Sequence, residues 1–256
     1  MEKEHIELIH DSLHELRYFN QSMITASSRL AQSVRTSVIG EKEPLNCSSE
    51  HAEEIRKHVE NLAFLTKLST TRLDFIEYEL NPEFFSQSVP YEVDLYSKFF
   101  GAKSVLNGTC KKHKVKVKLD SDIREHPCIM AVSLIDILPF LLLDNAVKYS
   151  PNEMDVVVKF IVYNDSLEVE ITSFGPYVPS DEIKKLFLKG YRGKNAKLLG
   201  VSGKGIGFYF ADRIVKLHDG RLTLESDAPT FSFNNVKYSR FKMVLKIPLA
   251  KEYMKT

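Results

Sequence analysis

Two short segments of this chain most constrain what it can fold into. In the first, Asn145 and Lys148 are three residues apart, so a helix would present the amide and the ammonium on one face. In the second, Gly203, Gly205 and Gly207 alternate with other residues, and glycine lets backbone N–H groups approach a phosphate closely. Together, the two segments predict a nucleotide site.

Two other kinds of glycine-rich phosphate site do not fit these residues. A P-loop needs a hydroxyl residue after its lysine, and here Gly203-Lys204 is followed by Gly205. A dinucleotide-binding fold has its glycines directly after a strand, whereas a basic segment over 188–195 precedes them here. Alone, each segment would be an ordinary solvated helix face or flexible loop, so the prediction depends on their combination and order.

Composition and charge indicate a soluble chain with room for two domains. Of the 256 residues 43% are hydrophobic, enough for packed cores, and the net charge of +1 gives no global field that favours nucleic acid or an anionic membrane. The cysteines are three and widely spaced, which favours a reducing cytosol over disulfides or a zinc site. The charged amino terminus argues against a signal peptide. We expect a cytoplasmic chain without membrane contact and leave open an upstream sensor or membrane segment.

The first third of the chain predicts two long amphipathic helices. Apolar residues recur at three- and four-residue steps over 6–34, and a second stripe runs over 55–80 until Asn81-Pro82 ends it. Two helices offer too few partners to bury both stripes. We therefore expect an antiparallel hairpin that pairs with a second copy into a homodimeric four-helix bundle.

The remaining chain alternates predicted strands and helices. The longest apolar run, over 129–143, is shorter than the roughly 20 residues that span a bilayer, and we predict that it belongs to a buried helix over 127–150. A basic and apolar alternation over 114–119 predicts a strand. Further segments are predicted as strands over 155–163, 166–172, 221–226 and 241–248, and as helices over 180–188 and 205–218.

The order of these features resembles the core of a sensor histidine kinase. The segment Asn-Ala-Val-Lys-Tyr-Ser (145–150), the pair Leu-Phe (186–187) and Gly-Lys-Gly-Ile-Gly (203–207) are similar to conserved boxes of the histidine-kinase ATP-binding domain, whose fold is shared with gyrase, Hsp90 and MutL. The resemblance implies an α+β protein with three parts: a dimerisation and histidine phosphotransfer hairpin (1–82), a linker (83–90) and a Bergerat-type α/β-sandwich ATP-binding domain (91–256).

His14 lies in a His-Glu-Leu-Arg tetrapeptide on the first predicted helix, one residue past an apolar seam position. This tetrapeptide resembles the phosphoacceptor box of histidine kinases, whose hairpin also precedes the ATP domain. The resemblance implies that His14 attacks the γ-phosphate of ATP as a neutral imidazole and that Glu15 orients its ring. The same context is missing around four other histidines, which we interpret as surface residues: His5, His10, His51 and His58.

The resemblance also assigns roles in the nucleotide site. Asn145 would coordinate Mg²⁺ through its amide oxygen, Lys148 would face phosphate, and Tyr149 would flank the base. The first glycine box of the family corresponds to the segment that begins at Ser173, in which Gly175 is retained. ATP and Mg²⁺ are therefore the expected cofactors.

A Lys/Arg-rich segment over 189–204 would form a mobile lid over the nucleotide. Phe187 would anchor one end of this lid, and Gly203, Gly205 and Gly207 would form its carboxyl hinge. Two basic residues of the lid are candidate phosphate contacts and are equally consistent with solvent-facing loop charges: Arg192 and Lys204.

Three departures from the family pattern bear on activity. Ser173 stands where the family has an Asp that accepts a hydrogen bond from the adenine amino group, and Tyr177 stands for the second glycine of that box. Leu141 stands where an amide is common. Tyr18 and Phe19 follow the histidine box, so no hydroxyl or amide there would orient a hydrolytic water, which argues against phosphatase activity.

The leading hypothesis is an ATP-dependent protein-histidine kinase core. It would phosphorylate itself on His14 and pass the phosphoryl group to the aspartate of a response-regulator receiver domain. The alternative is a non-catalytic dimer, either a phosphotransfer relay or a pseudokinase scaffold, with weakened nucleotide binding. The intact amide, lysine and second glycine box favour the kinase, and the altered first glycine box favours the alternative. A serine-directed kinase or a gyrase-like ATPase fits less well because neither requires a histidine-bearing bundle.

Overall fold

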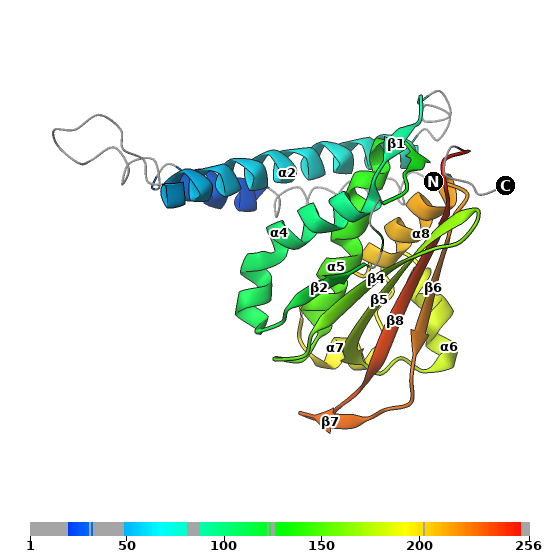
Figure 1. The fold of residues 1–256 in the computed structure, drawn as a ribbon. Helices are drawn as coiled ribbons and strands as arrows, with labels where there is room; N and C mark the ends of the chain where they lie inside the picture. Colours follow the sequence, from blue (N-terminus) through cyan, green and yellow to red (C-terminus); the bar gives the residue numbers. More distant parts are fainter. Residues whose placement is uncertain are drawn as a thin grey trace. The chain divides into compact units, whose positions relative to one another are not determined.

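The computed structural model describes residues 20–30, 32, 49–80, 88–121, 123, 126–201 and 203–251. The chain divides into two compact units between Ser88 and Val89. As predicted, a helical amino-terminal part is followed by an α/β sandwich (Figure 1). None of the described helices combines the length and apolar character needed to cross a membrane.

The amino-terminal unit is helical over 20–30 and in α2 (Ser49–Leu80). Thr66 Oγ1 donates a hydrogen bond to Met23 Sδ at 3.4 Å, so the two helices contact each other. On the exposed face of α2, Arg56 pairs with Glu53 one turn away at 2.6 Å. The predicted phosphoacceptor pair, His14 and Glu15, lies outside the described residues, and the pairing of two copies stays a prediction.

The carboxyl-terminal unit is built on one sheet with the strand order β2-β4-β5-β8-β6. β2 runs parallel to β4, and the other neighbours are antiparallel. These strands are β2 (Val117–Asp120), β4 (Val156–Val162), β5 (Ser166–Pro176), β6 (Arg221–Ser226) and β8 (Val236–Pro248). A short strand, β7 (Phe231–Phe233), forms a hairpin with β8 that extends beyond the sheet (Figure 1).

Three helices cover one face of this sheet (Figure 1): α4 (Leu95–His113), α5 (Leu138–Tyr149) and α8 (Gly207–Leu217). The buried face carries cross-strand rows of apolar side chains, which the helices shield from water. One row consists of Val158, Ile171, Met243 and Leu224, and the next of Phe160, Val169, Leu245 and Leu222. On β5 the buried position that follows Val169 and Ile171 is Ser173, where a polar residue interrupts the apolar series.

The predicted helix over 127–150 is wrong in its first half. β3 (Ile129–Ala131) pairs with β1 (Tyr91–Val93), and the 3₁₀ helix η1 (Ser133–Ile137) precedes α5. Ile129 and Ala131 are buried while Met130 is 44% exposed, the alternation of a strand. An apolar run of this length does not distinguish a buried helix from a strand followed by a helix.

Candidate functional site

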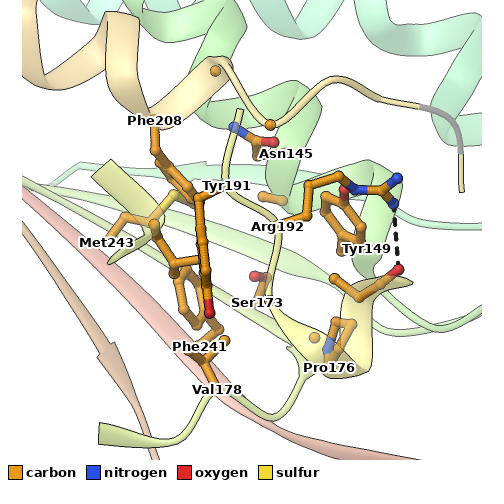
Figure 2. Close-up of a pocket in the computed structure, with 17 residues that line it drawn as sticks. Asn145, Tyr149, Ser173, Pro176, Val178, Tyr191, Arg192, Phe208, Phe241 and Met243 are labelled. Carbon is orange, nitrogen blue, oxygen red and sulfur yellow. Dashed lines mark hydrogen bonds between the residues drawn. The ribbon is translucent and has the colours of Figure 1, made fainter. Parts of the chain in front are cut away.

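A cavity lies between α5, the carboxyl half of β5 and the start of α8 (Figure 2). Seven of the ten predicted nucleotide-binding residues line it: Asn145, Tyr149, Ser173, Gly175, Arg192, Gly205 and Gly207. The other three, Lys148, Gly203 and Lys204, lie outside its lining. Segments that are far apart in the sequence therefore meet around one space, as the resemblance implies.

The amide of Asn145 lies against the start of α8. Its Nδ2 donates a hydrogen bond to the Leu141 carbonyl oxygen at 2.9 Å, which leaves Oδ1 as the end able to accept a cation. A Cβ at Gly207 would lie 2.8 Å from Nδ2 and 3.6 Å from Oδ1, so a side chain there would displace the amide from this position. Among the described residues no cluster of His, Cys, Asp or Glu could hold a metal. A Mg²⁺ ion here would be held by this amide together with substrate phosphates.

Lys148 lies against the second glycine box. A Cβ at Gly203 would come within 3.0 Å of Lys148 Nζ and 3.9 Å of the Tyr149 hydroxyl oxygen. The ammonium therefore lies near the loop that leads into the amino terminus of α8, where free N–H groups and the helix dipole favour an anion. This is the electrostatic environment that a phosphate requires.

One wall of the cavity is apolar (Figure 2). Its side chains include Val178, Phe208, Phe241 and Met243. Ser173 pairs directly with Phe241 across β5 and β8 and is 3% exposed. Such a wall with one polar group suits a flat heterocycle, because most binding free energy comes from apolar contact and a few polar groups set orientation.

The two ends of the predicted lid meet at the cavity. Gly190 N–H donates to the Gly205 carbonyl oxygen at 3.1 Å. A Cβ at Gly205 would overlap the Tyr191 carbonyl oxygen and lie 2.8 Å from the Tyr191 carbonyl carbon. Because φ at Gly205 is +72°, a side chain there would also be strained.

The predicted lid contains a short helix that was not predicted from the sequence, α7 (Lys194–Leu198). Arg192 Nη2 donates to the Val201 carbonyl oxygen at 2.7 Å. It also donates to the Ala196 carbonyl oxygen at 3.4 Å (Figure 2). In this structure the guanidinium stabilises the lid backbone. Its role as a phosphate contact stays a prediction.

Glu182, on the short helix α6 (Ser180–Ile183), was missed from the sequence. Its side chain is 1% exposed, and its Oε2 accepts a hydrogen bond from Lys194 N–H at 3.1 Å. Partial burial and a hydrogen bond to Glu182 raise the pKa of the Tyr191 hydroxyl. Asn195 Nδ2 adds a bond to the Tyr177 carbonyl oxygen at 2.7 Å. Hydrogen bonds thus connect the first half of the lid to the segment that follows β5.

Replacement of Gly205 by alanine should push the two ends of the lid apart. We expect the affinity for Mg·ATP, measured by calorimetry, to fall about tenfold or more, because Tyr191 and Arg192 line the cavity beside the overlap. Gly200 provides a matched control: its φ is +63°, and a Cβ there would meet open space. Gly200→Ala should therefore weaken binding far less, and equal effects of the two variants would contradict the role of the contact at Gly205.

Comparison with known proteins agrees with this geometry. Residues 140–250 match the family described as histidine kinase-, DNA gyrase B- and HSP90-like ATPase, and every residue that lines the cavity lies within this range. The resemblance of the chain to the core of a sensor histidine kinase is thereby confirmed.

Named relatives are similar over a larger share of the chain. The signal transduction histidine-protein kinase ArlS of Staphylococcus haemolyticus is 26% identical over 207 residues, 80% of this chain and 40% of ArlS. The sensor protein RprX of Bacteroides fragilis is 30% identical over 168 residues, 62% of this chain and 32% of RprX. The chain therefore spans less than half the length of these relatives.

A solved structure shows the same fold. The histidine kinase ThkA in complex with the response regulator protein TrrA aligns with a TM-score of 0.50 at 13% identity, over 98% of this chain and 66% of the matched chain. At this identity the likeness concerns the fold alone.

Proposed function

We propose that this chain is the ATP-dependent core of a protein-histidine kinase that phosphorylates itself on His14. The observation that best supports the proposal is that Asn145, Gly205 and Gly207 line a cavity with an apolar wall, with Lys148 beside Gly203 of the same glycine box, within the residues that match an ATPase family. One end suits a metal-bound triphosphate and the wall suits a base.

In this proposal, different residues of the site bind the metal, the phosphates and the base. Asn145 Oδ1 would hold Mg²⁺, which when bound neutralises charge on the phosphates. Lys148 and the free N–H groups at the start of α8 would hold phosphate oxygens. Ser173 and the apolar wall would hold the base, and Tyr149 would flank it. Such positioning supplies most of the catalysis in phosphoryl transfer.

His14 is the proposed acceptor of the phosphoryl group. A ring nitrogen of its neutral imidazole forms a bond to the γ-phosphorus of ATP while the bond from that phosphorus to the bridging oxygen breaks, and ADP leaves. Glu15 orients the ring through the other nitrogen and accepts the proton. A receiver-domain aspartate would next take the phosphoryl group from the imidazole, and the nitrogen–phosphorus bond breaks as the acyl phosphate forms.

The proposed partners follow from the same scheme. A homodimer through the helical hairpin would bury the apolar stripes that one copy leaves uncovered. A response-regulator receiver domain would accept the phosphate. The solved structure of a histidine kinase with a response regulator supports this pairing for a chain of the same fold. We propose that the reaction takes place in the cytoplasm, where ATP is available.

A second candidate is a non-catalytic phosphotransfer protein or pseudokinase scaffold. Two observations favour it: an uncharged Ser173 faces the base region of the cavity, and Arg192 is engaged with the lid backbone. An uncharged hydroxyl forms weaker hydrogen bonds than a carboxylate. Nucleotide affinity would then be too low for turnover.

Incubation of the protein with γ-labelled ATP and Mg²⁺ distinguishes these candidates. The kinase predicts incorporated label that is lost in acid and retained in base, because the phosphoramidate bond of phosphohistidine hydrolyses when its nitrogen is protonated. Label that survives acid would indicate a hydroxyl acceptor and contradict the proposal. No incorporated label would support the scaffold.

A further inference from the structure

Ser173 has a hydroxyl that is available to a ligand. The residue occupies a buried-face position of β5, the position at which Val169 and Ile171 carry apolar side chains in the preceding rows. It lines the cavity (Figure 2), and its Oγ forms no hydrogen bond with any other described residue. A hydroxyl that faces the cavity without an internal partner gains free energy when a ligand supplies one.

The other large polar side chains that line the cavity lie close to other groups of the protein. Asn145 lies against Gly207, and the Tyr149 hydroxyl lies near Gly203 at the phosphate end. Burial and the nearby Glu182 carboxylate raise the pKa of the Tyr191 hydroxyl, and Arg192 Nη2 donates to the Val201 carbonyl oxygen. Ser173 is the polar side chain best placed for the polar edge of a base, because it pairs with Phe241 of the apolar wall. Arg192 also keeps a buried Nε without a hydrogen-bond partner among the described residues, but a guanidinium only donates and cannot accept from a 6-amino group.

A serine hydroxyl does not impose the direction of that hydrogen bond. It rotates freely, so it accepts a bond from the 6-amino group of adenine or donates one to the 6-oxo group of guanine or hypoxanthine. A carboxylate at this position would accept only, and would repel a 6-oxo group. We propose that the phosphate donor of this site is a purine nucleoside triphosphate of either kind, 6-amino or 6-oxo, and that Ser173 determines this tolerance. The inference rests on the proposed nucleotide site.

The primary test compares nucleotides on the unaltered protein. Dissociation constants for the Mg²⁺ complexes of ATP, GTP and ITP are measured by calorimetry, with ITP included because its base has the 6-oxo group without the 2-amino group of guanine. We expect at least one 6-oxo nucleotide to bind within about tenfold of ATP, the range of one neutral hydrogen bond. A preference for ATP of more than tenfold over both would overturn the inference while leaving the proposed function intact. If no nucleotide binds, both fail.

Variants at Ser173 test whether this side chain determines the tolerance for 6-oxo purines. Ser173→Asp should raise the preference for ATP over ITP by about tenfold or more, because the carboxylate bonds to the amino group and repels the oxo group. Ser173→Ala should weaken ATP and ITP alike, by about three- to tenfold. Ser166→Ala, at a buried serine of the same strand whose hydroxyl bonds to Asp165, is the matched control and should change neither affinity. An unchanged ATP-to-ITP ratio in Ser173→Asp would overturn the role of Ser173.

Discussion

Replacement of His14 by glutamine should abolish incorporation of the acid-labile label. Glutamine keeps the polarity and approximate size of histidine, but its amide nitrogen is not a nucleophile and cannot carry the phosphoryl group. Dimer formation and Mg·ATP binding should remain, because neither the apolar stripes nor the cavity is altered. Gel-resolved labelling of the unaltered and variant proteins, with light scattering for the oligomeric state, measures both.

The matched control for this prediction is His58→Gln. His58 also lies on a helix beside a glutamate, with its Nε2 3.8 Å from Glu54 Oε1. If any helical histidine with an adjacent carboxylate could accept the phosphate, the two variants would each lose part of the label. We expect His58→Gln to retain all of it. Label that persists in His14→Gln would rule out His14 as the acceptor.

The lining of the cavity could be predicted from the sequence where the candidate residues are concentrated in short segments. Asn145 and Lys148 are one helical turn apart, so any helix there must present them together. The alternating glycines similarly require a close backbone approach, and the structure has a backbone neighbour at Gly205. In such segments local spacing shows which side chains share a face and where a close backbone approach is possible.

Other parts of the site depend on contacts between distant segments. Glu182 follows Ser180 and Asp181 in a sequence typical of an exposed helix start, yet its carboxylate is buried beside Lys194. Phe208 and Phe241 are apolar residues of a helix and a strand, and only the register of β8 with β5 brings Phe241 beside Ser173. Sequence spacing carries no information on either contact.

The helices also differ in how well they could be predicted from the sequence. Amphipathic periodicity predicted α2 to its last residue, Leu80, where Asn-Pro ends the pattern. In contrast, α4 was not predicted, although Asp94 caps it by accepting a hydrogen bond from Tyr96 N–H at 2.9 Å. The helix contains Gly101 and Gly108, which lower its local helix preference, and the buried apolar stripe that was missed consists of Leu95, Phe99, Ala102, Leu106 and Cys110. Packing on α5 stabilises this helix.

Replacement of Asn145 by alanine should weaken Mg·ATP binding by about 100-fold or more, because the change removes a direct metal ligand. The helix itself should be unaffected: alanine favours helix, and the side-chain bond to Leu141 is additional to the backbone ladder. Melting without nucleotide should therefore stay nearly unchanged.

The effect of Asn145→Ala should appear in the rise of the melting temperature that Mg·ATP causes. At a nucleotide concentration 100 times the dissociation constant of the unaltered protein, binding stabilises the folded state by about 2.7 kcal/mol, and a 100-fold weaker variant retains about 0.4 kcal/mol. At about 2–4 °C per kcal/mol, a melting shift near 8 °C should shrink to about 1 °C. Asn164→Ala, in the exposed turn between β4 and β5, should keep the full shift. A full shift in Asn145→Ala would mean that this amide does not hold the metal, and that the phosphates alone bring Mg²⁺ into the site.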